Sequence, residues 1–211
     1  LPQIKKRKVQ RIYIDPVATL GAVVAICMLV MMGTAGGELK KRSTIIPNCS
    51  GLTPSAYLIP KFVFYPLFVL VTVFISVVLC SVFASAIFAE SIALESTLVA
   101  AASAAVYSLF NISLYLMLGL STGRAGIAVA TCFLFGTLLG TVFQVLGVDK
   151  FHPYALQTQA TLAASGVPVD YLNLFGSIGV TVIIIVIFYL VTLFVFYAKR
   201  VDNRGNEKAP L

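Results

Sequence analysis

One stretch of the sequence has the pattern of a nucleophilic serine, and one histidine could activate it. Gly119-Leu120-Ser121-Thr122-Gly123 matches the G-x-S-x-G pattern of serine hydrolases, and His152 is the only histidine of the chain. A serine nucleophile and its base must share a hydrogen bond. Whether Ser121 and His152 can do so depends on the elements that carry them.

The other groups capable of chemistry are carboxylates and thiols. Glu90 and Glu95 could form a cation site or a proton relay, but they lie at the edges of apolar windows, so we expect solvated loop carboxylates. The four cysteines form no CxxC pair and have no neighbouring histidine, which argues against a metal site or a disulfide framework. They are Cys27, Cys49, Cys80 and Cys132. With no Walker loop and no HExxH motif, we expect no catalytic, cofactor or metal site.

The composition indicates an integral membrane protein. Of the 211 residues 59% are hydrophobic and only 11% are charged, whereas soluble domains average about 25% charged residues. The chain therefore lacks the polar residues to cover a soluble surface, and no common nucleic-acid module is expected. We interpret the net charge of +7 as a mark of cytoplasmic loops.

Five charge-free windows are long enough to cross a bilayer as helices, which takes about 20 residues. We therefore expect an all-α membrane helix bundle with five spans inside a transmembrane domain of residues 13–200. The expected spans are about 16–37, 62–88, 97–120, 125–147 and 173–198.

A sixth charge-free stretch, within 149–170, is too polar to face lipid. It carries His152, Gln157 and Gln159, and Pro153 and Pro168 bracket it. We expect one or two short external helices there, lying at the membrane interface or dipping into it.

These spans separate the two members of the possible hydrolase pair. They put Ser121 and His152 on opposite faces, about 30 Å of membrane apart. The G-x-S-x-G stretch is then a tight turn between two spans, and the chain is not expected to be an enzyme.

The distribution of Lys and Arg favours a cytoplasmic C-terminus. Nine of them fall on the side of the C-terminal tail, 201–211, and six on the other side, five of these before the first span. The nine are Lys40, Lys41, Arg42, Lys61, Arg124, Lys199, Arg200, Arg204 and Lys208. Residues 1–12 are expected to be the basic end of an external segment. Because the sequence starts at Leu1 and not Met, we expect a fragment or a processed chain.

The connection over 38–61 is the most informative segment. It leaves the first span with charged residues, continues through a Pro, Gly, Ser and Thr-rich middle, and reaches Lys61 at the mouth of the next span. Thr53 is suited to cap a short helix with Pro54 in its first position. The segment is either a solvated loop with basic anchors or a docking element for a cytoplasmic partner.

Here the sequence resembles the membrane subunits of ABC-2 type transporters. Glu38 to Arg42 look like the charged end of that family's second span, and Ser50-Gly51-Leu52-Thr53 looks like its Ser-Pro-Val-Ser-like motif, with Gly51 in place of the proline. Lys61-Phe62 resembles the start of the third span. His152-Pro153-Tyr154 looks like the motif before the family's external helices.

The resemblance implies a permease of a bacterial plasma-membrane exporter that here lacks its first span. A separate ATP-binding cassette ATPase would bind the 38–61 coupling loop, two permeases would form a homodimer or heterodimer surrounded by membrane lipids, and no nucleic acid would be involved. The residues implied in ATPase contact are Glu38, Arg42, Ser50, Leu52 and Thr53. Nothing in the spans selects a substrate.

A second hypothesis is a non-catalytic channel or membrane scaffold that assembles with other membrane chains. It predicts no dependence on a nucleotide-binding partner, so an ATPase encoded beside the chain would separate the two hypotheses.

Overall fold

Five helices make up the part of the chain that the structure describes, and no strand occurs in that part. The computed structural model describes residues 53–88, 94–122, 124–146, 150–165 and 167–206. The helices are α4 (Pro54–Phe88), α5 (Leu94–Thr122), α6 (Ala125–Val145), α7 (Pro153–Ala164) and α8 (Tyr171–Asn206). The all-α class expected from the sequence is confirmed.

Three of these helices are long and apolar enough to cross a membrane. The apolar windows are Ser55–Phe83 in α4, Leu94–Thr122 in α5 and Tyr171–Ala198 in α8. At 1.5 Å per residue each exceeds the hydrocarbon thickness of about 30 Å, which indicates a membrane protein. The expected span 125–147 corresponds to α6, which is not among these three helices. The expected span 16–37 and the segment 1–12 lie outside the described residues, so the five-span arrangement stays a prediction.

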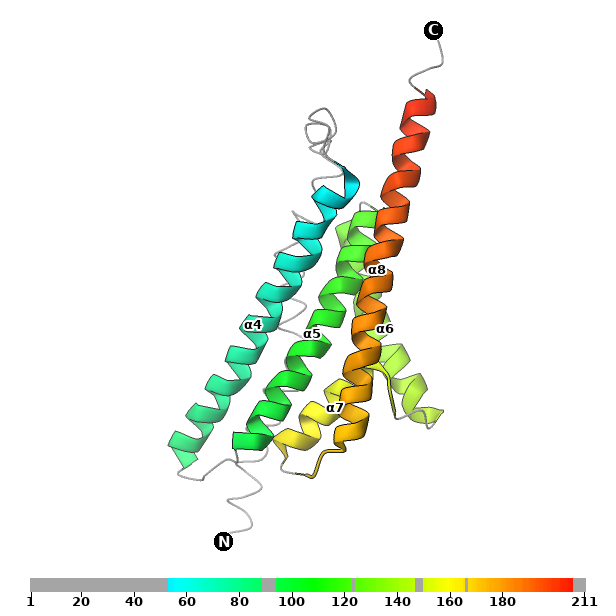
Figure 1. Cartoon of the computed structure of the whole chain (residues 1–211). Helices are drawn as coiled ribbons and strands as arrows, with labels where there is room; N and C mark the ends of the chain where they lie inside the picture. The colour runs from blue at the N-terminus through cyan, green and yellow to red at the C-terminus, as the bar shows by residue number, and fades with distance from the viewer. Residues whose placement is uncertain (1–52, 89–93, 123, 147–149, 166, 207–211) are drawn as a thin grey trace.

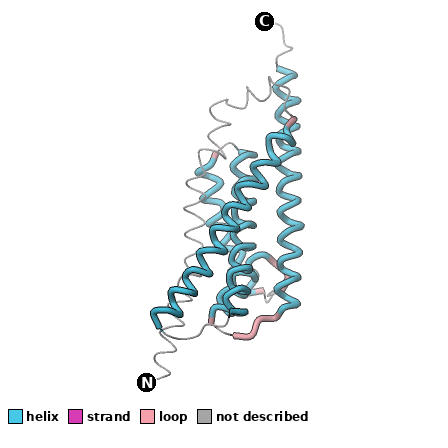
Figure 2. Tube along the Cα trace, turned by 60° about the vertical axis from the view of Figure 1, so that its left-hand side comes forward, coloured by secondary structure: helices cyan, strands magenta, loops and turns pink. Residues whose placement is uncertain are grey.

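The helices are arranged around α5, which contacts each of the other four. Figure 1 shows α4 running antiparallel to α5, while α8 runs parallel to it. We call one end of the bundle the Lys61 end; it holds the first turn of α4 and the last turns of α5 and α8. The opposite end, the α7 end, holds the start of α5, the end of α7 and the start of α8, and Figure 2 shows the loop from α7 to α8 there.

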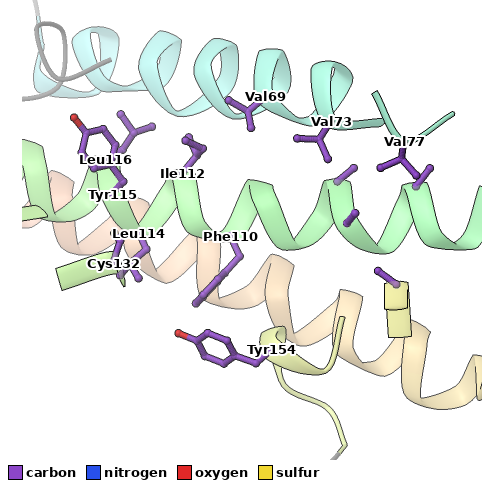
Figure 3. Packing of buried hydrophobic residues seen from close by; sticks show 14 of the residues in the cluster. Val69, Val73, Val77, Phe110, Ile112, Leu114, Tyr115, Leu116, Cys132 and Tyr154 are labelled. Atoms are coloured by element: carbon purple, nitrogen blue, oxygen red, sulfur yellow. The ribbon is translucent and has the colours of Figure 1, made fainter. Parts of the chain in front are cut away.

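Small side chains on α5 allow this close packing. Ala100, Ala101, Ala104 and Ala105 are buried, and Ser103 among them is fully buried. Residues of this size let neighbouring backbones approach, which is how membrane helices associate without a hydrophobic driving force between them. Val69, Val73 and Val77 of α4, four residues apart, form the facing stripe (Figure 3).

Helix α4 is longer than the span expected from the sequence. It starts at Pro54 and continues without interruption through Pro60 and Pro66. Residues 54–61, assigned from the sequence to the 38–61 loop, therefore form the first turns of the helix and not a separate short helix. Proline is favoured at the first helical position, and transmembrane helices tolerate internal prolines because neighbouring groups satisfy the released carbonyls.

Helix α8 is also longer than expected. The sequence places a span over 173–198 and a tail from 201, whereas the helix begins at Tyr171 and continues to Asn206. The apolar window ends at Ala198, so the last two turns extend the helix past the apolar stretch.

Helix α7 is a single helix that begins inside the bundle. The ring of Tyr154, in its first turn, lies 6.1 Å from the ring of Tyr107 and 5.7 Å from that of Phe110. Tyr107 is thirteen residues after Leu94, roughly 20 Å along α5. The first turn of α7 therefore packs against the middle of α5, while the position of α7 relative to the membrane interface stays a prediction.

Candidate functional site

Only one of the five residues implied in ATPase contact lies in the described part of the chain. Glu38, Arg42, Ser50 and Leu52 fall outside it, and Thr53 is exposed directly before α4. The Thr53 hydroxyl accepts a hydrogen bond from Ala56 N–H at 3.3 Å, and the Thr53 carbonyl accepts one from Tyr57 N–H at 3.2 Å. Thr53 thus caps α4, as its sequence position predicts.

The first turns of α4 pack against the second half of α8 through aromatic contacts. The rings of Tyr57 and Phe196 lie 5.9 Å apart, and those of Phe62 and Tyr189 meet edge to face at 5.7 Å. Such pairs contribute about 0.5–1.5 kcal/mol beyond the apolar area that they bury.

Lys61 lies beside these contacts and is 8% exposed. Its Nζ lies 4.7 Å from the centroid of the Tyr57 ring, a cation–π geometry. The sequence predicts Lys61 at the mouth of a span. The structure adds that its ammonium group packs on an aromatic ring one turn earlier in α4.

Two exposed residues lie at the Lys61 end. Thr53 is exposed there, and so is Arg124, whose N–H donates to the Thr122 hydroxyl at 3.2 Å. The Thr53 cap, Arg124 and the aromatic contacts thus involve the start of α4, the end of α5 and the second half of α8.

The structure does not bring Ser121 and His152 together. Ser121 lies in the last turn of α5, and His152 is tied to the first turn of α7, whose Tyr154 contacts Phe110. Phe110 and Ser121 are eleven residues apart, roughly 16 Å along the helix axis. This is less than the 30 Å expected, because α7 begins inside the bundle, but far beyond a hydrogen bond. A helical serine also lacks the strand-to-helix turn of a hydrolase nucleophile.

The first turn of α7 belongs to an aromatic cluster in the middle of the bundle. Tyr154 packs against Phe110 of α5 (Figure 3) and against Tyr107 of the same helix. Phe110 in turn packs against Phe188 of α8 at 5.9 Å. Burial raises the pKa of the Tyr154 phenol, so its hydroxyl stays neutral at physiological pH. The cluster joins α5, α7 and α8 without a charge.

A second set of contacts fixes the α7 end. Asn173 of α8 is buried, and its Oδ1 accepts hydrogen bonds from Phe151 N–H at 3.2 Å and from the Ser177 hydroxyl at 3.4 Å. Glu95, expected to be a solvated carboxylate, accepts a hydrogen bond from the Tyr171 hydroxyl. Glu90 lies outside the described residues.

Two further observations bear on the chemistry. In the part of the chain that the structure describes, no group of three His, Cys, Asp or Glu residues is placed to hold a metal ion. No protein-family model, no curated protein and no solved structure matches the chain.

Several of these contacts carry no signal in the sequence. Glu95 and Tyr171 are 76 residues apart, and nothing local couples them. The aromatic residues of α4 and α8 are typical of any membrane helix, so their pairing depends on which faces meet. A histidine followed by a proline could have been identified as a helix cap, because a proline at the first helical position leaves the preceding residue to cap.

Proposed function

We propose that the chain is the membrane permease of an ATP-driven exporter of the ABC-2 type, with five spans in a bacterial plasma membrane. A separate ATPase subunit would bind the segment from Glu38 to Thr53, and two permeases would form the working unit. The support is the order of features in the sequence: charged residues after one apolar span, a Thr-capped helix with Lys61 in its second turn, and a short helix before the last span.

One structural observation carries the proposal furthest. The exposed Thr53 cap begins a helix whose first turn packs on α8 through Tyr57 and Phe196. Force applied by a partner at Thr53 would reach two membrane-length helices at once. A coupling element needs this property, whereas a solvated loop does not.

The test is co-expression of the full-length chain with the ATPase encoded beside it. We expect the two to co-purify and ATP hydrolysis to be stimulated, with both lost in Glu38→Lys and Arg42→Glu variants. Lys150→Glu is the matched control, since it reverses an exposed charge at the α7 end. Loop variants that retain the ATPase, or the absence of any adjacent ATPase, would favour the channel or scaffold.

A further inference from the structure

The first turn of α7 is capped by a side chain that can change its charge. His152 Nδ1 accepts a hydrogen bond from Ala155 N–H at 3.1 Å, and Pro153 follows in the first helical position. Ala155 N–H also lies 3.1 Å from the His152 carbonyl, so one donor is shared between two acceptors. The usual capping residues Ser, Thr, Asp and Asn accept such a bond at every physiological pH.

An imidazole can accept at Nδ1 only while that nitrogen carries no proton. Protonation turns Nδ1 into a second donor facing Ala155 N–H and places a positive charge at a helix N-terminus, where the dipole is also positive. Both effects oppose the capped state. Histidine is the side chain whose ordinary titration falls between pH 5 and 8.

His152 is in contact with neutral groups of α7, the Ala155 N–H and the Tyr154 ring. The His152 ring lies 6.3 Å from that of Tyr154, which contacts Tyr107 of α5. On the α8 side the neighbouring Phe151 N–H binds the neutral amide of Asn173. The described charged groups at the α7 end are Lys150, Glu95 and Asp170, all exposed.

We propose that His152 is a proton-sensitive cap that holds α7 in the bundle when neutral and releases its first turn when protonated. The folded arrangement favours the neutral imidazole, because only that form accepts the bond from Ala155 N–H. The cap therefore stabilises the first turn of α7 at high pH, and this stabilisation is lost as the pH falls and His152 becomes protonated. The released turn carries Tyr154, so its aromatic contacts with α5 loosen together with the cap. This inference does not depend on the exporter proposal.

The test is hydrogen–deuterium exchange of the full-length protein in lipid nanodiscs at pH 5 and pH 8. Rates are divided by the intrinsic exchange rates at each pH, and a peptide from the middle of α5 is the internal reference. We expect exchange in the first turn of α7 to be about fivefold faster at pH 5, the factor that corresponds to a cap of about 1 kcal/mol.

Two variants separate the cap from general effects of acid. His152→Asn caps without titrating and should show the same slow exchange at both pH values, whereas His152→Ala should exchange fast at both. An equal response to pH in His152→Asn and the wild type would overturn the proposal, and so would an unchanged wild type.

A second measurement needs no variant, because His152 is the only histidine of the chain. Histidine-selective nitrogen labelling then reports this ring alone by NMR. We expect the tautomer protonated at Nε2 at pH 8 and the imidazolium at pH 5. A proton on Nδ1 at pH 8 would exclude the cap.

Discussion

The Tyr171 hydroxyl donates a hydrogen bond to the Glu95 carboxylate and so joins the first turn of α8 to the first turn of α5. The two helices run parallel, and the same pair is in contact again in mid-bundle through Phe110 and Phe188. The Tyr171–Glu95 bond therefore sets which residues of α5 and α8 lie side by side at the α7 end.

Disrupting this bond should have effects that are not additive. Tyr171→Phe and Glu95→Ala should each lower the thermal midpoint of unfolding, and the double variant should lower it by less than the sum, because both changes remove the same hydrogen bond. Circular dichroism in detergent is the suitable measurement, since the chain has no tryptophan. Tyr197→Phe, at the opposite end of α8, is the control. Strict additivity would contradict the bond.

Gly176→Ala should weaken the packing of Phe151, which lies just before α7, against α8. A Cβ at this position would clash with Cδ1 of Phe151, whose backbone lies in the left-handed region at a φ of 60°. The Phe151 N–H is bonded to Asn173, which holds the backbone, but the Phe151 ring is 46% exposed and can rotate away in part. We expect a loss of about 1 kcal/mol in the free energy of unfolding, the lower end for overpacking.

Gly179→Ala is the matched control for this substitution, because no atom lies within 4 Å of its added Cβ. It should be neutral or stabilise α8 by up to about 1 kcal/mol through helix propensity. Phe151→Ala should rescue Gly176→Ala by removing the ring. Equal effects of the two glycine substitutions would show that the Phe151 contact is not tight.

The bond between α4 and α5 inside the membrane should be weak. The hydroxyls of Ser81 and Thr97 lie 2.9 Å apart and are buried. Hydrogen bonds between membrane helices average about 0.6 kcal/mol, so a cycle of Ser81→Ala and Thr97→Val should give a coupling of that size. Denaturant unfolding in mixed micelles measures it. A coupling several times larger would mean that the two hydroxyls belong to a wider polar network.

Removing the cap of α4 should loosen only its start. Thr53→Ala deletes the acceptor of Ala56 N–H, and loss of such a cap costs about 1 kcal/mol. Hydrogen exchange in the first turn of α4 should then accelerate about fivefold, with no change in α8. Thr53→Asp keeps an acceptor and should behave like the wild type. Faster exchange throughout α4 would show that the helix is less continuous than the structure has it.

The sequence predicts the helices well because the physical signals for them are local. Charge-free windows indicate membrane helices, the alanines from Ala100 to Ala105 predict close packing, and Thr53 before Pro54 predicts a helix start. Each signal depends on a few consecutive residues. The positions of the helix ends were less predictable, since Pro60 and Pro66 are as compatible with a loop as with a membrane helix.

What the sequence could not predict depends on packing between distant segments. The polarity of 149–170 does not indicate which helix this segment packs against, and only the aromatic contacts of Tyr154 place the first turn of α7 against the middle of α5. The candidate coupling residues stay a prediction except for the helix cap at Thr53, because the other four lie outside the described residues.

The central position of α5 has a consequence for how the protein is made. Of the three membrane-length helices, α5 is the least apolar and the most buried, with Ser103, Ser108 and Asn111 inside the bundle. During synthesis α5 reaches the translocon before α6, α7 and α8 exist, so α4 is the only described helix that can then shield its polar face. Insertion of α5 is therefore a cooperative step with α4, and substitutions on their shared face should affect yield in cells before they affect the finished fold.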